Sequence, residues 1–268
     1  MTQYRKVAGD VLGRIRANKP VVHSITNYVV MNSTANVLLA MGASPIMAHA
    51  PEEMEDIIAI ANSMVINIGT LSRSWVQSMT LASHVAKVSG KPFVLDPVGA
   101  GATRLRTRTA LDIISSSLPT VIRGNASEIL ALSPSGGTTR GVDSTHTTDA
   151  AADAARSMAL SLETIIAVTG ETDFVTDGRK GLVISGGHEL MKYVTGTGCA
   201  ASVVVAAFLA EEPDPLAATA GALAFLALAG EKAAAEATAP GTFWVKLLDA
   251  LYTITPAELS GNARIMRK

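Results

Sequence analysis

Two hydrophobic spacings alternate along most of this chain. Short uninterrupted apolar runs are typical of strands buried on both faces of a sheet, and apolar residues that return every three or four positions are typical of amphipathic helices. The predicted strands are Val21 to Ile25, Ala43 to Ala48, Met64 to Ile68, Pro92 to Asp96, Thr120 to Arg123 and Ile165 to Val168. The predicted helices are Met1 to Pro20, Asn32 to Met41, one beginning near Glu52, Ser72 to Val88, Arg104 to Ser117, one capped by Asn125, and Asp149 to Leu162. This order predicts an α/β fold with a mostly parallel central sheet and helices on both faces.

The pattern changes after the last of these strands. Phe174 to Asp177 and Gly181 to Ile184 are apolar runs on either side of a short polar turn, which predicts a hairpin and an antiparallel edge of the sheet. The stretch from Ser133 to Thr148 is rich in Gly, Ser and Thr and is predicted to be a loop. From Gly198 onward we predict helices to about Ala210, from Leu216 to Ala237, and a last one after Pro240. No long polar linker interrupts the chain, so we expect residues 1–268 to form one domain.

Composition excludes several classes of protein. The chain has a formal net charge of -1 and only 4% aromatic residues, so it offers neither the basic stripe nor the stacking side chains of a nucleic-acid-binding protein. The longest apolar run, Leu216 to Gly230, is shorter than the ~20 residues of a membrane span, and the amphipathic N-terminus lacks the apolar centre of a signal peptide. A single cysteine forms no internal disulfide. We therefore expect a cytoplasmic protein with no nucleic-acid or membrane partner.

Polar side chains stand at the ends of several predicted strands, where ligands bind in open α/β sheets. Asp96 precedes a glycine-containing turn, where a carboxylate either holds a metal ion near phosphates or forms an Asx turn. Arg123 could clamp a phosphate or pair with a nearby carboxylate. Thr169 follows the last parallel strand. Asn125 and Glu128 have the spacing of a helix capping box, which is a structural role.

The stretch Val194 to Val205 passes from glycines into an unbroken apolar helix. Gly196 and Gly198 can adopt backbone angles closed to other residues, and the free N–H groups of a helix start attract anions. Cys199 lies at this helix start, a position that favours a thiolate, although a free cysteine is more often a small buried hydrophobe. Gly196 to Ala201 also fits a dinucleotide-binding fingerprint, but that motif should follow the first strand of a nucleotide-binding half.

Several segments together resemble hydroxyethylthiazole kinases, which have the ribokinase-like fold. The matching segments are His23 to Tyr28, Met41 to Ala50, Asn67 to Leu71, Leu95 to Ala100, Arg123 to Glu128 and Val194 to Cys199. The resemblance implies a thiamine-salvage kinase that transfers the ATP γ-phosphate, with Mg²⁺, to the hydroxyl of 4-methyl-5-(2-hydroxyethyl)thiazole. It also implies a homotrimer whose active sites lie at subunit boundaries. The alternative from another class is a trimer that binds a nucleotide or thiazole as a sensor, and a nicotinamide-linked enzyme is a more distant one.

Residue roles follow from the resemblance position by position. Met47 and Gly196 would contact the thiazole, although methionine at such a position is also a common core residue. Arg123 and Thr169 would bind ATP.

The remaining positions would serve the transfer itself. Asp96 and Glu128 would bind the metal and phosphates. Cys199 stands where the wider superfamily has an aspartate base, and the Gly-Thr-Gly-Cys motif matches the thiazole kinases rather than the superfamily's Gly-Ala-Gly-Asp. A catalytic base, support of an oxyanion and a structural role all remain open for this cysteine.

Overall fold

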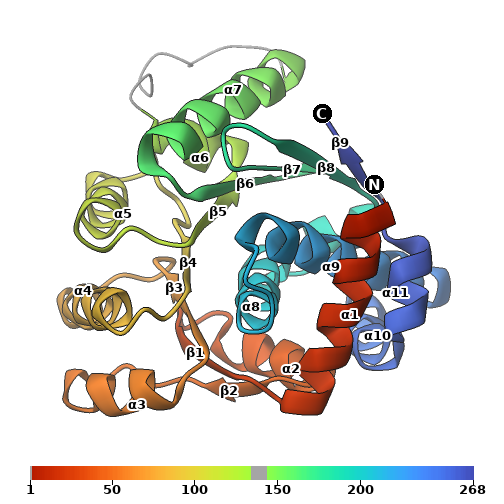
Figure 1. Cartoon of the computed structure of the whole chain (residues 1–268), viewed down its shortest axis with the longest axis horizontal. Coiled ribbons are helices and arrows are strands. Elements are labelled where there is room, and N and C mark those ends of the chain that lie inside the picture. Colours follow the sequence, from red (N-terminus) through yellow and green to blue (C-terminus); the bar gives the residue numbers. More distant parts are fainter. Residues whose placement is uncertain (1, 134–143) are drawn as a thin grey trace.

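A nine-stranded sheet runs through the molecule in the order β2-β1-β3-β4-β5-β6-β7-β8-β9. The computed structural model describes residues 2–133 and 144–268 (Figure 1). The parallel strands are β1 (Val21–Ile25), β2 (Ser44–Ile46), β3 (Ser63–Asn67), β4 (Phe93–Asp96), β5 (Val121–Asn125) and β6 (Ile165–Thr169). The antiparallel strands are β7 (Thr172–Thr176), β8 (Gly181–Ser185) and β9 (Ile265–Arg267). The mostly parallel sheet and the antiparallel late edge are therefore both confirmed.

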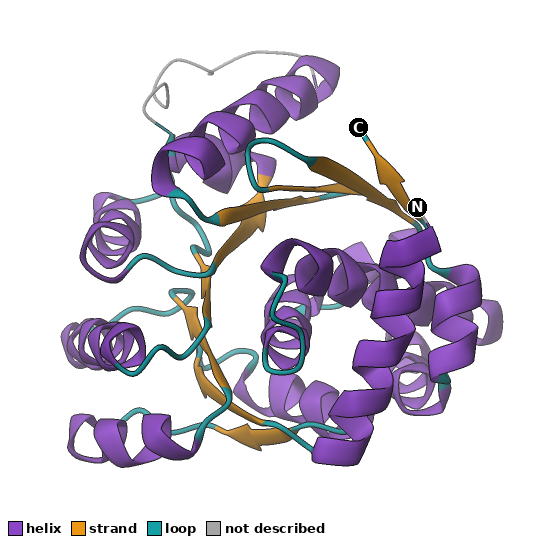
Figure 2. Cartoon of the chain, in the orientation of Figure 1, coloured by secondary structure: helices purple, strands orange, loops and turns teal. Residues whose placement is uncertain are grey.

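Helices cover both faces of the sheet (Figure 2). On one face lie α3 (Met54–Ile60), α4 (Arg73–Val88), α5 (Arg104–Ser117), α6 (Ala126–Leu132) and α7 (Ser144–Leu162). On the other lie α1 (Thr2–Asn18), α2 (Met31–Met41), α8 (Thr197–Leu209), α9 (Pro215–Glu236), α10 (Pro240–Thr253) and α11 (Pro256–Asn262). Short 3₁₀ helices are η1 (Pro51–Glu53) and η2 (Glu189–Tyr193). The sheet thus separates two hydrophobic cores, because successive strand residues point to opposite faces.

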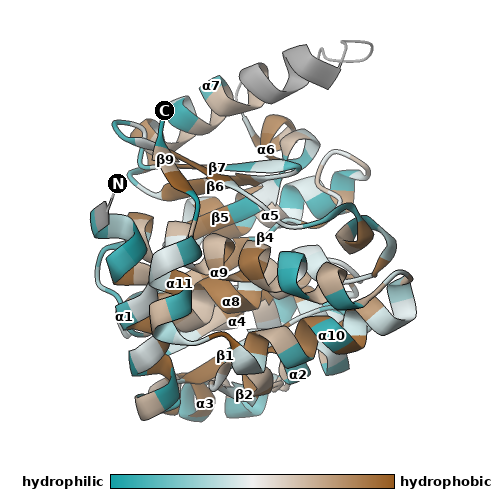
Figure 3. Ribbon diagram, turned by 90° about the vertical axis from the view of Figure 1, so that its right-hand side faces the viewer, coloured by the Kyte–Doolittle hydropathy of each residue, from teal (hydrophilic) through white to brown (hydrophobic). Residues whose placement is uncertain are grey.

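The helices α8 and α9 form the centre of the second core. Their apolar residues lie in the middle of the molecule (Figure 3). The helix α9 has 22 residues and is therefore longer than the apolar run from Leu216 to Gly230. By length and composition alone it could cross a membrane. However, 78% of its most apolar window is buried inside the protein, so α9 is a core helix.

The structure differs from the sequence predictions mainly at its C-terminal end. After α10 the chain forms α11 and then β9, which pairs with β8, whereas the sequence predicted only one helix after Pro240. A three-residue strand is too short to produce a periodic signal. The helix α7 begins at Ser144, inside the predicted loop, and the rest of that loop lies mostly outside the described residues. The single domain expected over residues 1–268 stays a prediction.

Candidate active site

Polar side chains lie at or near the ends of the central strands, on the face that carries α8. Asn67, Asp96 and Arg123 each come two positions after a valine of the core that contains α8. These valines are Val65, Val94 and Val121. Because side chains repeat with a period of two along a strand, the polar residues point toward α8 as well. The sequence period therefore explains why they converge at one place.

The start of α8 requires both of its glycines. Gly196 is the N-cap, with a φ of 89°, and a Cβ there would lie 2.8 Å from Cγ1 of Val30. At Gly198 a Cβ would lie 3.2 Å from both terminal nitrogens of Arg123. No side chain caps the helix, and its first N–H groups have no partner within the helix. The guanidinium of Arg123 and the positive end of a helix thus lie side by side.

The Cys199 thiol is neutral rather than ionised. Its Sγ accepts hydrogen bonds from Nδ2 of Asn67 at 3.2 Å and from Nδ2 of Asn27 at 3.7 Å. Burial, and then the negative charge of Asp96, raise the pKa of the Cys199 thiol to about 11. The expectation that the helix start favours a thiolate is therefore wrong, because desolvation and the charge of Asp96 outweigh the two amide hydrogen bonds and the charge of Arg123.

Asn67 connects the thiol to the rest of the site, a role that its place in the sequence does not predict. Its Nδ2 also donates to Oδ2 of Asp96 at 2.9 Å. Its Oδ1 accepts from Nδ2 of Asn27 at 2.8 Å and from the N–H of Gly69 at 3.0 Å, which fixes the orientation of the amide. As a site residue, Asn67 could have been found in the same way as Asp96, because both are polar residues at the end of a buried strand.

Asp96 is fully buried and only partly satisfied. Its Oδ2 accepts hydrogen bonds from Asn67 and from Oγ of Ser202 at 2.8 Å, and Nη1 of Arg123 lies 3.5 Å away. Its Oδ1 has no hydrogen-bond partner. Burial raises the pKa of this carboxyl, and the charge of Arg123 opposes that shift. Among the described residues, the Asp96 carboxylate therefore meets only side-chain donors and keeps one free, buried oxygen. It does not form the Asx turn that the sequence left open as an alternative.

Arg123 and Thr169, the two residues to which the family resemblance assigns ATP binding, lie together. Nη2 of Arg123 donates a hydrogen bond to Oγ1 of Thr169, the last residue of the adjacent strand β6. The Arg123 side chain also pairs with Asp96, so the carboxylate-pairing alternative is observed. Its buried Nε has no partner. The arginine thus retains a donor that a ligand could use.

The capping box at α6 is confirmed. Oδ1 of Asn125 accepts from the N–H of Glu128 at 2.9 Å, and Oε2 of Glu128 accepts from the N–H of Asn125 at 2.8 Å. In addition, Oε1 of Glu128 accepts from the N–H of Gly99 at 2.9 Å. Glu128 therefore ties the turn after Asp96 to the start of α6. Each of its oxygens keeps one lone pair for another ligand.

No ready-made metal centre occurs in the part of the chain that the structure describes, since it has no group of three or more His, Cys, Asp or Glu side chains that could hold an ion. Magnesium in phosphoryl-transfer sites commonly binds one or two carboxylates together with substrate phosphates and water. The free Oδ1 of Asp96 and the partly used carboxylate of Glu128 fit that donor set.

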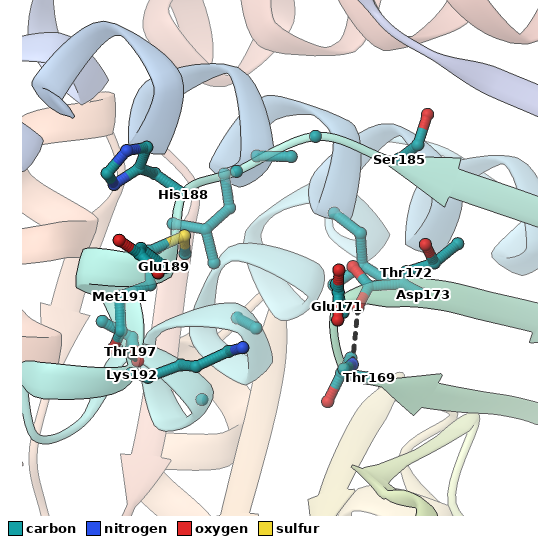
Figure 4. Close-up of a pocket in the computed structure, with 18 of the residues that line it drawn as sticks. Thr169, Glu171, Thr172, Asp173, Ser185, His188, Glu189, Met191, Lys192 and Thr197 are labelled. Carbon is teal, nitrogen blue, oxygen red and sulfur yellow. Dashed lines mark hydrogen bonds between the residues drawn. The ribbon is translucent and has the colours of Figure 1, made fainter. Parts of the chain in front are cut away.

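A pocket of about 720 Å³ opens beside the start of α8 (Figure 4). Arg123, Thr169, Thr197 and Gly198 line it, together with the β6–β7 turn, the segment from Ser185 to Lys192 and one side of α9. This volume lies in the range of small-molecule sites. Met47 does not line this pocket, because it follows β2, at the opposite end of the sheet.

The chain matches a family model over most of its length. Residues 12–257 match the model of the hydroxyethylthiazole kinase family. A hydroxyethylthiazole kinase from Desulfotalea psychrophila is 54% identical over 265 residues, which cover 99% of this chain and 97% of that protein.

Solved structures give the same result. The hydroxyethylthiazole kinase protein from Pyrococcus horikoshii OT3 superimposes with a TM-score of 0.89 at 45% identity, covering 97% of this chain and 98% of that chain. A ribokinase-like superfamily protein from Enterococcus faecalis V583 superimposes with a TM-score of 0.64, covering 92% and 95% of the two chains, and its 16% identity shows the fold alone. The fold is therefore ribokinase-like, and this chain is an enzyme that belongs to the hydroxyethylthiazole kinase family.

Proposed function

We propose that the enzyme transfers the γ-phosphate of ATP to the hydroxyl of 4-methyl-5-(2-hydroxyethyl)thiazole, for thiamine salvage in the cytoplasm. The observation that carries the proposal is the guanidinium of Arg123 held against Gly198 at the start of α8, beside a pocket of suitable size. A cation and free backbone N–H groups at one point suit a phosphate undergoing transfer.

The order of strands supports a division of the site into two sides. Arg123 lies on β5 and Thr169 ends β6, and both would bind the nucleotide. Met47 follows β2, and Gly196 packs against Val30 at the start of α2, so these two would bind the thiazole on the other side. Cys199 lies between them, at β3 and β4, through its contact with Asn67. This arrangement would bring the thiazole and the nucleotide from opposite sides, so that the acceptor hydroxyl meets the γ-phosphate at the α8 N-terminus.

The residues at the α8 N-terminus would stabilise the transferring group. Phosphoryl transfer commonly passes through a loose transition state, in which positioning and charge stabilisation matter more than deprotonation of the nucleophile. The N–H groups of Gly198 and Cys199 would donate to the phosphoryl oxygens. Sγ of Cys199 holds its proton at neutral pH and accepts from two amides, so the S–H would serve as a donor to the bound substrates rather than as a base.

Asp96 and Glu128 would hold Mg²⁺ together with the phosphates of the nucleotide. The free Oδ1 of Asp96 and the remaining lone pairs of Glu128 supply oxygen ligands of the type that this ion prefers. When bound, Mg²⁺ neutralises charge that develops on the phosphates. We also propose, from the family resemblance, a homotrimer with its sites at subunit boundaries, which light scattering of the native enzyme would test.

A coupled assay of ADP release tests the function. ADP should appear only when ATP, Mg²⁺ and the thiazole alcohol are all present. The methyl ether of the same alcohol is the matched control, because it preserves the ring and removes the acceptor hydroxyl. Equal ADP release with the ether, or none with the alcohol, would overturn the proposed reaction.

A further inference from the structure

The cations that line the pocket differ in what they contact. Arg123 pairs with Asp96 at 3.5 Å, and Nη1 of Arg264 pairs with Oε1 of Glu231 at 2.9 Å. Lys192 also lines the pocket, but among the described residues it has no carboxylate within 4.0 Å and no hydrogen-bond partner. A cation left without a partner at a pocket wall is available to an anionic ligand.

The backbone of Lys192 is held in place. It lies on η2, and Oγ1 of Thr197 donates to the carbonyl of Met191 at 2.9 Å, which ties this segment to the first turn of α8. Its side chain extends into the pocket and points toward the β6–β7 turn that carries Thr169 and Glu171 (Figure 4). Lys192 and the α8 N-terminus therefore face the same space.

The charges that line the pocket restrict where an anionic ligand can bind, and Lys192 lies at one of the few favourable places. Four carboxylates line the pocket against the three cations, namely Glu171, Asp173, Glu189 and Glu231. A polyphosphate would be repelled by the carboxylates that have no cation beside them, so it should lie where cations and free N–H groups gather. Those groups are Lys192, Arg123 and the first turn of α8.

We propose that Lys192 binds the terminal phosphates of the nucleotide from the side of the pocket opposite Arg123. The inference rests on the proposed use of ATP and adds a binding residue to it. Lys192 is exposed, so its contribution is partly screened by salt and should fall at the low end for a charge-assisted hydrogen bond.

Calorimetric titration with ATP, ADP and AMP, without the thiazole, tests the proposal independently of turnover. Lys192→Met keeps most of the aliphatic stem and removes the charge. It should weaken ATP and ADP about tenfold and AMP less than twofold, as expected for a lost contact of about 1.4 kcal/mol. Lys192→Arg should restore most of the ATP affinity. Added salt should weaken ATP binding more in the native enzyme than in Lys192→Met.

Lys180→Met is the matched control, because Lys180 is also exposed but lies at the far end of the β7–β8 hairpin and outside the pocket. It should bind all three nucleotides normally. Equal losses for ATP and AMP in Lys192→Met, or no loss relative to the control, would overturn the role of Lys192. If native enzyme bound no ATP at all, the proposed function itself would fail. A lowered melting temperature in Lys192→Met, unmatched by Lys192→Arg, would identify a structural effect on η2 and also refute the proposal.

Discussion

The guanidinium of Arg123 lies so close to the backbone of Gly198 that a Cβ on Gly198 would come within 3.2 Å of both Nη1 and Nη2. Arg123 cannot retreat easily, because Asp96 and Thr169 hold its two terminal nitrogens. The helix start and the arginine are therefore positioned by one another.

This contact predicts two effects of Gly198→Ala. Alanine favours the helix over glycine by up to about 1 kcal/mol, but disturbing the pair between Arg123 and the buried Asp96 costs more, so the melting temperature should fall. The added methyl should displace Arg123 and raise the KM for ATP by about three- to tenfold. Steady-state kinetics and thermal unfolding check both parts, and an unchanged KM would show that Arg123 does not act on ATP from this position.

Arg123→Ala should weaken ATP more than tenfold and leave the affinity for the thiazole nearly unchanged, because a guanidinium has little to offer a neutral heterocycle. It also leaves the buried Asp96 without its ion pair, which costs up to about 3–5 kcal/mol of unfolding free energy. Arg123→Lys is the control that retains a charge near Asp96. A loss of thiazole affinity with normal ATP binding would contradict the assignment.

Cys199→Ala separates the roles of the thiol. With a pKa of about 11, only about one thiol in 10⁴ is ionised at pH 7, so the loss of a base should not dominate. We expect turnover to fall about tenfold, with ATP affinity intact. A loss of 10³-fold or more would instead indicate a base.

Cys199→Asp should fold and remain active. The new carboxylate would accept hydrogen bonds from the amides of Asn67 and Asn27, which now donate to Sγ, and it would lie at a helix start that tolerates anions. The negative charge of Asp96 would disfavour this carboxylate, as it disfavours the thiolate of Cys199. Turnover and melting temperature measured beside Cys199→Ala decide the matter, and an unfolded Asp variant would indicate that Cys199 is core filling.

Asp173 should make stability depend on pH. Burial raises the pKa of this carboxyl to about 6, against the opposing effects of the Gly170 N–H and Arg123. The folded state therefore binds more protons than the unfolded state between about pH 4 and 6, so the unfolding free energy should fall as pH rises through that window.

Asp173→Asn should remove this dependence and stabilise the protein at pH 8 by no more than about 3 kcal/mol. The asparagine oxygen can still accept the hydrogen bond that Oδ1 of Asp173 receives from Gly170 at 3.0 Å. Denaturant unfolding at pH 4, 6 and 8 measures the effect, and Asp173→Ala is the control that also removes the acceptor. Parallel pH profiles for the native enzyme and Asp173→Asn would contradict the prediction.

Periodicity was sufficient to predict the parallel core. The runs around Val65, Val94 and Val121 predicted β3, β4 and β5, and the spacing of Asn125 and Glu128 predicted the capping box that the structure has. These features depend on residues that are close together in the sequence, so they can be predicted from the sequence alone.

The features that depend on burial and on distant contacts could not be predicted. The thiol of Cys199 meets Asn67, Asn27 and Asp96 only in the folded chain, and its desolvation reverses the effect expected from the helix start. The proposed role of Lys192 could not be predicted from its neighbours in the sequence. It depends on the absence of a carboxylate near its ammonium group among the residues that the structure describes. The proposed roles of the site residues stay predictions.

The β6–β7 connection determines how the proposed nucleotide side of the site can vary. After β6 the chain turns back directly into β7, rather than crossing over through a helix as it does after each earlier strand. The pocket wall at Gly170 and Glu171 is therefore a short surface turn, whereas Asn67 and Asp96 lie on buried strands. A change in the sequence or length of this turn would alter which nucleotide fits without moving the groups at α8, so donor preference can evolve separately from the transfer chemistry.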